Sequence, residues 1–442
     1  MMWRPCGAFA RSPVERTPVI LVENRGLPFV NLYCNFQMGP AFDPPGRAGL
    51  TSLTNRMLAR GTKQRGRAAL EEAIEILGTE LVTSTQRDAV SVGGSVLTRN
   101  LEKFLGILTE VLTESTFDAD ELEKVKREVC AELLSDRDDD GTLAAIWFRR
   151  LTFAGHAFGH GGQGTIPGVS AITREDVLAQ AARMYTRDNM LVGASGDADV
   201  ETLERLLAPL SALPTGRPDW TFPAITPPVG RHIALIDKPD RTQAQIIVGH
   251  PSFQASDPDY HAVEIATTAF GGTFTSRLME EVRVKRGWSY GAHARIAVER
   301  ANGYFLMSAA PALGYAPETV GLLLAEYEKF VNEGLSDEEI DFARGYILKT
   351  YPFRVETAGL RSAQLVQSRL LGRPDDYVAR YCERLAALSH DAIRDAVRRR
   401  LDPANLRVII VGTAAEGDFQ SKLELLPGVT ALTVIPHDQE LT

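Results

Sequence analysis

The amino-acid sequence contains the same long motif twice. ITREDVLAQAARMYTRDNMLVGASGD begins at Ile172 and LSHDAIRDAVRRRLDPANLRVIIVGT begins at Leu388, an offset of 388 − 172 = 216 residues. The two segments align without gaps, so that Asn189 corresponds to Asn405 and Gly196 to Gly412. Each copy predicts a capped amphipathic helix, a turn that contains Asn, and an apolar strand that ends in Gly. A repeat of this length predicts two similarly folded halves.

Two further matches extend the duplication upstream. LPFVNLYCNFQMGPAFDPPG is similar to QAQIIVGHPSFQASDPDYH, where Phe36-Gln37 corresponds to Phe253-Gln254. More weakly, TFDADELEKVKREVCAELL matches GLSDEEIDFARGYILKTY, and both predict helices with an acidic first turn. We therefore expect an α+β fold of two homologous domains, residues 1–212 and 233–442, each a mostly antiparallel sheet packed against helices. Residues 213–232 contain five prolines and are expected to be a linker.

Composition excludes several classes of protein. Hydrophobic residues make up 44% and charged residues 24% of the 442 residues, which is typical of a globular chain. The net charge of 48 − 57 = −9 argues against a nucleic-acid partner, because binding to polyanions depends on clustered cations. The densest basic run, residues 398–400, lies on a helical pattern and is predicted to be a solvated face. No apolar run reaches the ~20 residues that a membrane-spanning helix needs, so we expect no membrane partner.

The cysteines and the N-terminus bear on the compartment. Cys6, Cys34, Cys130 and Cys382 are far apart in the sequence and form no CxxC pair, which fits a reducing environment. The N-terminal MMWRPCGAFARSP lacks the apolar core of a signal peptide. We therefore expect a cytoplasmic protein, or a periplasmic one if a signal peptide has been removed.

Three segments carry a resemblance to a known family. They are GLTSLTNRMLARGT at residues 49–62, the loop AGHAFGHGGQGT at residues 154–165, and GGTFTSRLMEEVRVKRGWSY at residues 271–290. In this order they resemble the pitrilysin/insulinase metallopeptidases, whose relatives include the mitochondrial processing peptidase subunits. The resemblance covers roughly residues 18–413.

The first segment differs from the zinc-binding members of that family. Leu50, Leu53 and Met57 recur at helical spacing and are expected to face the core. The adjacent face presents Ser52, Asn55 and Arg56. The resemblance implies that these residues stand where the family has the His, Glu and His of an inverted His-x-x-Glu-His motif. Ser and Asn are poor zinc ligands, and an arginine places a permanent positive charge against the metal.

The remaining ligand position is Glu132, which lies 132 − 56 = 76 residues after Arg56, at about the spacing of the family's carboxylate ligand. A single carboxylate cannot hold a zinc ion that needs three protein ligands. Glu132 is alternatively a helix glutamate paired with a neighbouring base, and Arg56 is a candidate for that base. We expect no metal and no cofactor in this chain.

Other catalytic constellations find little support. His156 and His160 have an i, i+4 spacing, but the glycines around them predict a loop, so a metal site there would have an incomplete ligand shell. No Ser/His/Asp or Cys/His set can be assembled from the spacings. Gly271-Gly272 lacks the surrounding residues of a phosphate-binding loop.

The third segment keeps the family's pattern. The resemblance implies that Arg283 and Tyr290, seven residues apart, bind the substrate backbone near the scissile bond. A guanidinium offers a fork of donors to carbonyl or carboxylate oxygens, and a phenol can donate to an oxygen that becomes negative. Alternatively, Arg283 pairs with Glu280 or Glu281, and Tyr290 packs on the sheet. Arg277, Arg286 and Trp288 are further candidates for substrate contact.

The lost metal positions and the retained pair suggest a divided active site. The resemblance implies that this chain is the non-zinc subunit of a heterodimeric peptidase and is inactive alone. Its partner would be a homologous chain with an intact His-x-x-Glu-His helix and the zinc, and a substrate peptide would add as a strand to a sheet edge on the zinc side. The alternative is a catalytically inert structural or peptide-recognition subunit of a larger assembly.

Overall fold

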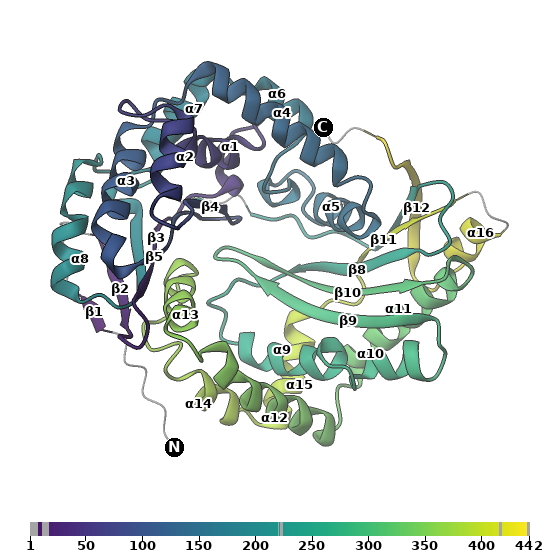
Figure 1. Ribbon diagram of the computed structural model, residues 1–442. Helices are drawn as coiled ribbons and strands as arrows, with labels where there is room; N and C mark the ends of the chain where they lie inside the picture. The colour runs from purple at the N-terminus through teal and green to yellow at the C-terminus, as the bar shows by residue number, and fades with distance from the viewer. Residues whose placement is uncertain (1–7, 11–16, 220, 222–223, 415–417, 440–442) are drawn as a thin grey trace.

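The computed structural model describes residues 8–10, 17–219, 221, 224–414 and 418–439, which form two six-stranded sheets (Figure 1). The first sheet has the order β1-β2-β6-β3-β5-β4. Its strands are β1 (Ala8–Ala10), β2 (Val19–Glu23), β3 (Phe29–Phe36), β4 (Val82–Thr85), β5 (Val90–Leu97) and β6 (Met190–Gly196). The second has the order β12-β7-β11-β8-β10-β9. Its strands are β7 (Arg231–Asp237), β8 (Gln245–Ser252), β9 (Ser289–Val298), β10 (Gly303–Pro311), β11 (Arg407–Gly412) and β12 (Val429–Pro436).

The two sheets repeat one topology, apart from the outer strands β1 and β12. In each, a parallel pair (β2 with β6, β7 with β11) is followed by antiparallel neighbours (β3, β5 and β4; β8, β10 and β9). The outer strands differ, because β1 is antiparallel to β2 whereas β12 is parallel to β7. The predicted α+β fold with an internal duplication is confirmed.

Helices surround both sheets. In the first half they are α1 (Leu50–Met57), α2 (Arg67–Glu75), α3 (Leu101–Glu114), α4 (Ala119–Ser135), α5 (Asp140–Thr152), α6 (Ile166–Ala171), α7 (Arg174–Met184) and α8 (Val200–Leu207). In the second they are α9 (Tyr260–Thr267), α10 (Arg277–Met279), α11 (Ala316–Asn332), α12 (Asp337–Arg354), α13 (Ala358–Leu370), α14 (Tyr381–Ala386), α15 (His390–Arg400) and α16 (Phe419–Glu424). Thr173 caps α7 and Ser389 caps α15 at equivalent positions of the repeat, and each side chain accepts a backbone N–H of the first turn.

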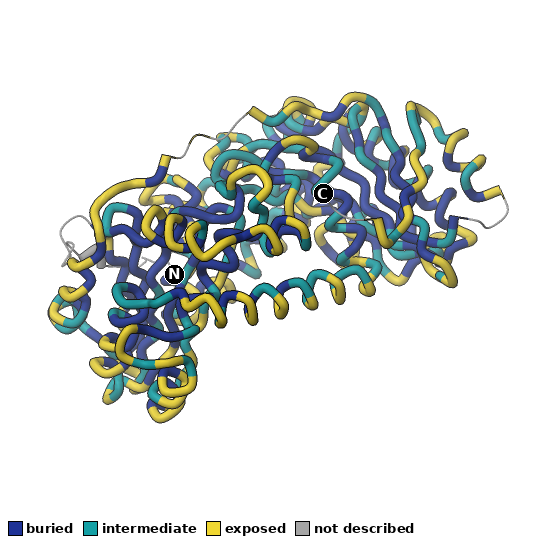
Figure 2. Tube along the Cα trace, turned by 90° about the horizontal axis from the view of Figure 1, so that it is seen from above, coloured by how far each residue is buried: buried dark blue, intermediate teal, exposed yellow. Residues whose placement is uncertain are grey.

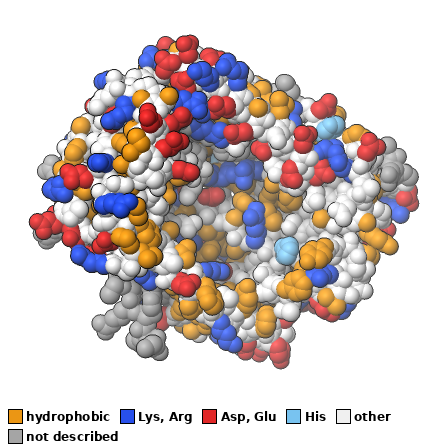
Figure 3. All heavy atoms as spheres, viewed as in Figure 1, with side chains coloured by type: hydrophobic (Ala, Val, Ile, Leu, Met, Phe, Trp, Pro, Cys, Tyr) orange, Lys and Arg blue, Asp and Glu red, His pale blue; other side chains and the backbone are white. Residues whose placement is uncertain are grey.

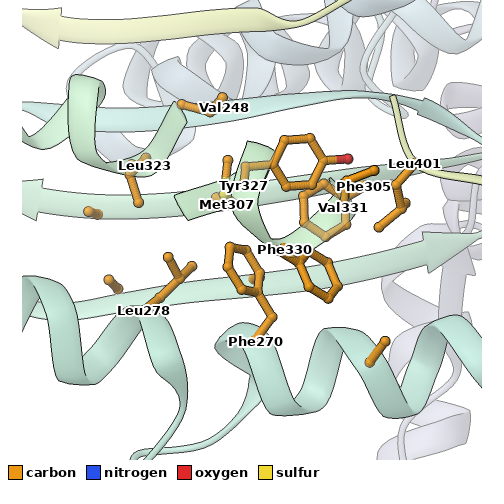
Figure 4. Packing of buried hydrophobic residues seen from close by; sticks show 14 of the residues in the cluster. Val248, Phe270, Leu278, Phe305, Met307, Leu323, Tyr327, Phe330, Val331 and Leu401 are labelled. Atoms are coloured by element: carbon orange, nitrogen blue, oxygen red, sulfur yellow. The ribbon is translucent and has the colours of Figure 1, made fainter. Parts of the chain in front are cut away.

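Each sheet has a hydrophobic core on its outer face, and Figure 2 shows buried chain in both halves of the molecule. In the second half the rings of Phe270 and Phe330 stack with centroids 4.3 Å apart, and those of Phe305 and Tyr327 with centroids 4.8 Å apart (Figure 4). Leu50, Leu53 and Met57 of α1 lie in the core of the first half, as their spacing predicts. These cores hold the helices of each half in fixed positions on their sheet.

The inner faces of the sheets are covered by helices from the opposite half. Helix α5, which follows α4 in the first half, packs on β8 and β11, and α13 of the second half packs on β2 and β6. Trp147 and Phe148 of α5 contact Ile247, Leu306 and Ile409, among others. The starts of α5 and α13 are 358 − 140 = 218 residues apart, so the two helices are equivalent in the repeat. The halves are therefore interlocked by an exchange of equivalent helices.

Two equivalent hairpin turns also meet between the halves. The β4–β5 turn contributes Arg87 and Asp88, and the β9–β10 turn contributes Glu299 and Arg300. Arg87 Nε lies 3.5 Å from Glu299 Oε1, and the backbone N–H of Arg300 donates to Asp88 Oδ2 at 3.2 Å. Burial, and then the nearby charge of Asp88, raise the pKa of Glu299 to about 7.

The expected linker overlaps the second sheet at its end. Strand β7 begins at Arg231, so Arg231 and His232, the last two residues of the expected linker, belong to that sheet.

Other expectations concern the cysteines, the membrane and the basic run. Cys34, Cys130 and Cys382 are free thiols, and Cys6 lies outside the described residues. Within the described part of the chain, no helix is both long and apolar enough to cross a membrane. The predicted solvated face at residues 398–400 is exposed at Arg398 and Arg399 and half-buried at Arg400, and Arg399 and Arg400 also form ion pairs with Asp259.

Candidate functional site

The start of α1 is fixed by Asp43. Its carboxylate accepts the backbone N–H groups of Gly49 and Thr51 at 2.8 and 2.9 Å and the Thr51 hydroxyl at 2.6 Å. Burial raises the pKa of Asp43 to about 6, although these hydrogen bonds oppose the shift. Gly49, with φ of 103°, adopts a left-handed conformation that favours glycine at this N-cap. These contacts set the orientation of the face where the family's zinc ligands would lie.

Two of the predicted positions on α1 are buried and uncharged. Ser52 and Asn55 have relative exposures of 5% and 1%. Asn55 Nδ2 donates to the Ser84 carbonyl of β4 at 2.9 Å, and Asn55 Oδ1 accepts the Tyr185 hydroxyl at 3.1 Å. Asn55 thus joins α1 to β4 and to the residue that ends α7. Its amide is engaged in structural hydrogen bonds.

Arg56 and Glu132, the third and fourth of the predicted metal-site positions, form a bidentate ion pair with each other. Arg56 Nη1 and Nη2 donate to Glu132 Oε1 and Oε2 at 2.8 and 2.7 Å. The hydrogen bonds from Arg56 hold the pKa of Glu132 below its usual range. The carboxylate in the family's ligand position is therefore occupied by a guanidinium. Among the described residues, no cluster of three or more His, Cys, Asp or Glu could hold a metal ion.

The two loop histidines border the same cavity, but His156 is engaged within its own loop. His156 is buried, and its Nδ1 accepts the backbone N–H of Phe158 at 3.0 Å. His160 lies on the other side of a short 3-10 turn, η4 (Ala157–Gly159), and borders a pocket. Burial and the charge of Arg150 lower the pKa of His160. A ring nitrogen of His156 is thus already used to shape the loop.

Arg283 and Tyr290 are brought together in the second half. Arg283 lies in the π-helical segment η8 (Glu280–Val284) and Tyr290 near the start of β9. The guanidinium carbon of Arg283 is 4.8 Å from the centroid of the Tyr290 ring. Tyr290 is 84% exposed, so the alternative that it packs on the sheet is wrong. The pair presents a phenol and a guanidinium side by side at the surface.

Phe274 completes this cluster and was not anticipated from the sequence. Its ring centroid lies 4.3 Å from the guanidinium carbon of Arg283, so that two aromatic rings flank one cation. Phe274 is 65% exposed. The available signal was a single aromatic residue in the small and polar run GGTFTS, directly before SRL. We call Phe274, Arg283 and Tyr290 the aromatic–arginine cluster.

Arg283 has no acidic partner among the residues that the structure describes, and its buried Nη1 has no hydrogen-bond partner there. The expected alternative partner Glu281 instead binds Lys285 at 2.6 Å and Arg286 at 2.7 Å. The alternative in which Arg283 pairs with Glu281 is therefore wrong. The guanidinium keeps unused donor capacity next to an exposed phenol.

The other candidates in this segment make structural contacts. Arg277 binds Glu339 through two hydrogen bonds of 2.9 and 2.7 Å. Trp288 is half-buried and stacks on Tyr315 with ring centroids 6.0 Å apart. Arg286, already paired with Glu281, lies 5.4 Å from the Trp288 ring centroid. Two of the three side chains, Arg277 and Arg286, are thus paired with acidic residues.

Comparison with protein families identifies two matching segments. Residues 19–140 match the family described as "Insulinase (Peptidase family M16)", and residues 171–345 match "Peptidase M16 inactive domain". Among curated proteins, the chain is 26% identical over 403 residues to a "Non-peptidase homolog" of Helicobacter pylori, covering 90% of this chain and 92% of that one. It is 23% identical over 368 residues to an "Uncharacterized zinc protease" of Streptomyces coelicolor, covering 82% and 80%.

Solved structures share the fold. A peptidase M16 inactive domain from Pseudomonas fluorescens has a TM-score of 0.85 at 24% identity, covering 93% of this chain and 99% of that one. A protease from Helicobacter pylori has a TM-score of 0.81 at 15% identity, covering 92% and 100%. Both likenesses extend over the two sheets and their helices.

Proposed function

The chain belongs to the insulinase (M16) peptidase family, and from this membership we propose that it is the non-zinc subunit of a heterodimeric zinc metallopeptidase. It would pair with a homologous chain that carries an intact His-x-x-Glu-His helix, and the two would hydrolyse peptides together. The observation that carries the proposal is the aromatic–arginine cluster, an exposed phenol beside a guanidinium that has no acidic partner among the described residues.

The first half argues against a zinc ion in this chain. Ser52 and Asn55 are neutral and buried, and Arg56 directs its charge to where a metal cation would lie. The Glu132 carboxylate already binds that guanidinium through both oxygens. A tetrahedral zinc site needs three protein ligands with free lone pairs, and these residues do not provide them. The metal and its activation of water therefore have to come from the partner.

The aromatic–arginine cluster supports a role in substrate binding. Arg283 would donate to peptide carbonyl oxygens with its planar fork, which Phe274 and Tyr290 hold from both sides. Tyr290 would donate its hydroxyl to the carbonyl oxygen of the scissile bond as that oxygen becomes negative. Both groups would act in trans on a peptide held by the partner. Since neither residue abstracts a proton or attacks the peptide, the chain alone would not hydrolyse it.

A catalytically inert role is the second candidate. It is favoured by the similarity to the Helicobacter pylori relative, which is described as a non-peptidase homolog. In that case the chain would be a structural or peptide-recognition subunit, and the cluster would make no contribution to the rate of hydrolysis.

Mixing experiments separate these functions. Peptidase activity on an unstructured peptide is measured for this chain, for a zinc-bearing homologue from the same organism, and for the two together. The proposed function predicts strong activity only in the mixture. Activity of this chain alone would contradict it. A mixture no more active than the zinc-bearing chain would favour the inert role.

A further inference from the structure

A basic pocket lies in the first half beside the degenerate metal positions. It is formed by the end of α4, one face of α5 and the glycine-rich loop at residues 159–166, and encloses a cavity of about 260 Å³. Leu133, which follows Glu132 on α4, and Asp136, which caps the end of that helix, belong to its wall. Its cationic lining comes from three arginines: Arg137, Arg149 and Arg150.

The sequence of α5 explains why arginines face this pocket. One side of the helix packs on the second sheet through Leu143, Ala144, Trp147 and Phe148. The opposite side, at i, i+3, i+4 and i+7 spacing, lines the pocket with Thr142, Ala145, Ile146 and Arg149. The exchange of helices between the halves therefore fixes Arg149 at the inner wall. Figure 3 shows Lys and Arg side chains gathered in the hollow between the two halves.

The charges of the pocket are poorly balanced. Arg137 and Arg149 form no ion pair with the described residues, although Arg149 lies near Glu299, where its charge only partly opposes the rise in the pKa of Glu299 that burial causes. The one acid in the lining is Asp136, whose pKa is raised by burial and by Glu132 and Asp139, and not lowered by any cation. Arg137 and Arg149 outnumber this one carboxylate, so the lining carries an excess of positive charge. The pocket is therefore suited to an anionic group.

The side chains of the lining favour a planar carboxylate over a spherical anion. Planar guanidinium groups bind carboxylates through paired hydrogen bonds. Gln163 also lines the pocket, and its Oε1 is buried without a hydrogen-bond partner among the described residues. That oxygen would accept an N–H, which a peptide has next to its terminal carboxylate.

A second cavity continues the first. It has a volume of about 680 Å³ and shares Arg150, His160 and the glycines at 159 and 161 with the basic pocket. Its remaining wall is largely apolar and includes Pro40, Pro44, Pro45, Leu151 and Phe153. A ligand with its anionic end at the arginines would place an uncharged portion here.

We propose that the basic pocket binds a carboxylate of a peptide, with Arg137 and Arg149 as its principal cations. The choice of a peptide as ligand rests on the proposed function, whereas the choice of a carboxylate rests on the pocket itself. The carboxylate is either the C-terminus or an acidic side chain near it. This site is separate from the aromatic–arginine cluster, which lies in the other half of the chain.

Binding is tested on the full chain without a partner, so that the outcome does not depend on peptidase activity. An uncharged peptide labelled at its N-terminus is titrated by fluorescence anisotropy as the free acid, as the C-terminal amide, and as the amide with one glutamate before the end. The same titrations use Arg149→Gln, Arg137→Gln and, as a matched control on the outer helix α15, Arg398→Gln. Thermal unfolding verifies that each variant is folded.

We expect the free acid, or the glutamate-containing amide, to bind at least roughly tenfold more tightly than the plain amide, because a charged hydrogen bond is lost in the amide. Whichever of the two binds tightly identifies the source of the carboxylate. Arg149→Gln and Arg137→Gln should remove this preference, and Arg398→Gln should retain it. Equal binding of all three peptides, or a preference that survives in both pocket variants, would overturn the proposal.

Discussion

Arg56 on α1 and Glu132 on α4 form a bidentate ion pair with distances of 2.8 and 2.7 Å. These two residues lie 76 positions apart, and the resemblance to the family predicts that they stand at two of its zinc-site positions. The salt bridge joins the helices α1 and α4. This part of the chain therefore has a structural role in holding α1 against α4.

Replacing Arg56 with methionine should destabilise the protein slightly. The pair is partly exposed, with side-chain exposures of 28% and 44%, so we expect a loss of about 0.5–1 kcal/mol in the free energy of unfolding at neutral pH. The folded state lowers the pKa of Glu132, so this stabilisation is present above the unfolded value and is lost as the pH falls through the folded value. Urea unfolding of both proteins at neutral and acidic pH tests this. A difference that persists in strong acid would contradict the assignment.

Restoring the missing ligands should restore zinc binding. Ser52→His with Arg56→His places two imidazoles one turn apart on α1 and frees the Glu132 carboxylate, which gives three ligands. We expect about one zinc per chain after dialysis, measured by mass spectrometry of the metal content. The matched control is Arg56→His alone, which supplies only two ligands and should retain much less. Equal zinc contents in the two variants would show that these residues do not converge on one point.

The exchange of helices between the halves predicts a large effect at Trp147. This side chain is 3% exposed and packs between α5 and the second sheet. Trp147→Ala should lower the free energy of unfolding by about 3–5 kcal/mol, because a large cavity would remain at the junction of the halves. Trp147→Phe fills much of that space and should cost less. The midpoints of urea unfolding give both values, and equal stability of the two variants would contradict the packing.

Phe274 should act as a positioning residue for Arg283. Cation–π contacts at exposed sites contribute about 0.5–1 kcal/mol, so Phe274→Ala should lower kcat/KM of the mixed subunits by roughly two- to fivefold. Phe274→Tyr keeps an aromatic face and should restore most of the activity. A loss of the same size in both variants would indicate that the contact with Arg283 is not what matters.

The sequence predicted the repeat better than the arrangement of its parts. The gapless offset of 216 residues predicted two halves with the same fold, and the two sheets do repeat one topology. Strands β6 and β11, for example, end in glycines at equivalent positions. The repeat and the motifs did not predict that helix α5 packs on the opposite sheet. Hydrophobic periodicity identifies a buried side chain and carries no information about its partner.

The same reason explains the outcomes at the candidate sites. The resemblance to the family predicted that Arg283 and Tyr290 act together, but neither it nor their seven-residue spacing could show that Phe274 packs over the guanidinium. Likewise, the ion pairs of Arg399 and Arg400 with Asp259 depend on the packing of α15 against α9, which no local pattern encodes. Long-range contacts of charged side chains follow from the tertiary fold.

The proposed action of Tyr290 in trans on a substrate is tested most directly by kcat of the mixed subunits with Tyr290→Phe. Loss of one hydrogen bond to a developing oxyanion should lower kcat by about 10²–10³-fold, or roughly 2.7–4 kcal/mol. Tyr346→Phe, at an exposed tyrosine on α12 of the same half, is the matched control and should leave kcat unchanged. A Tyr290→Phe mixture as active as the wild type would contradict the account.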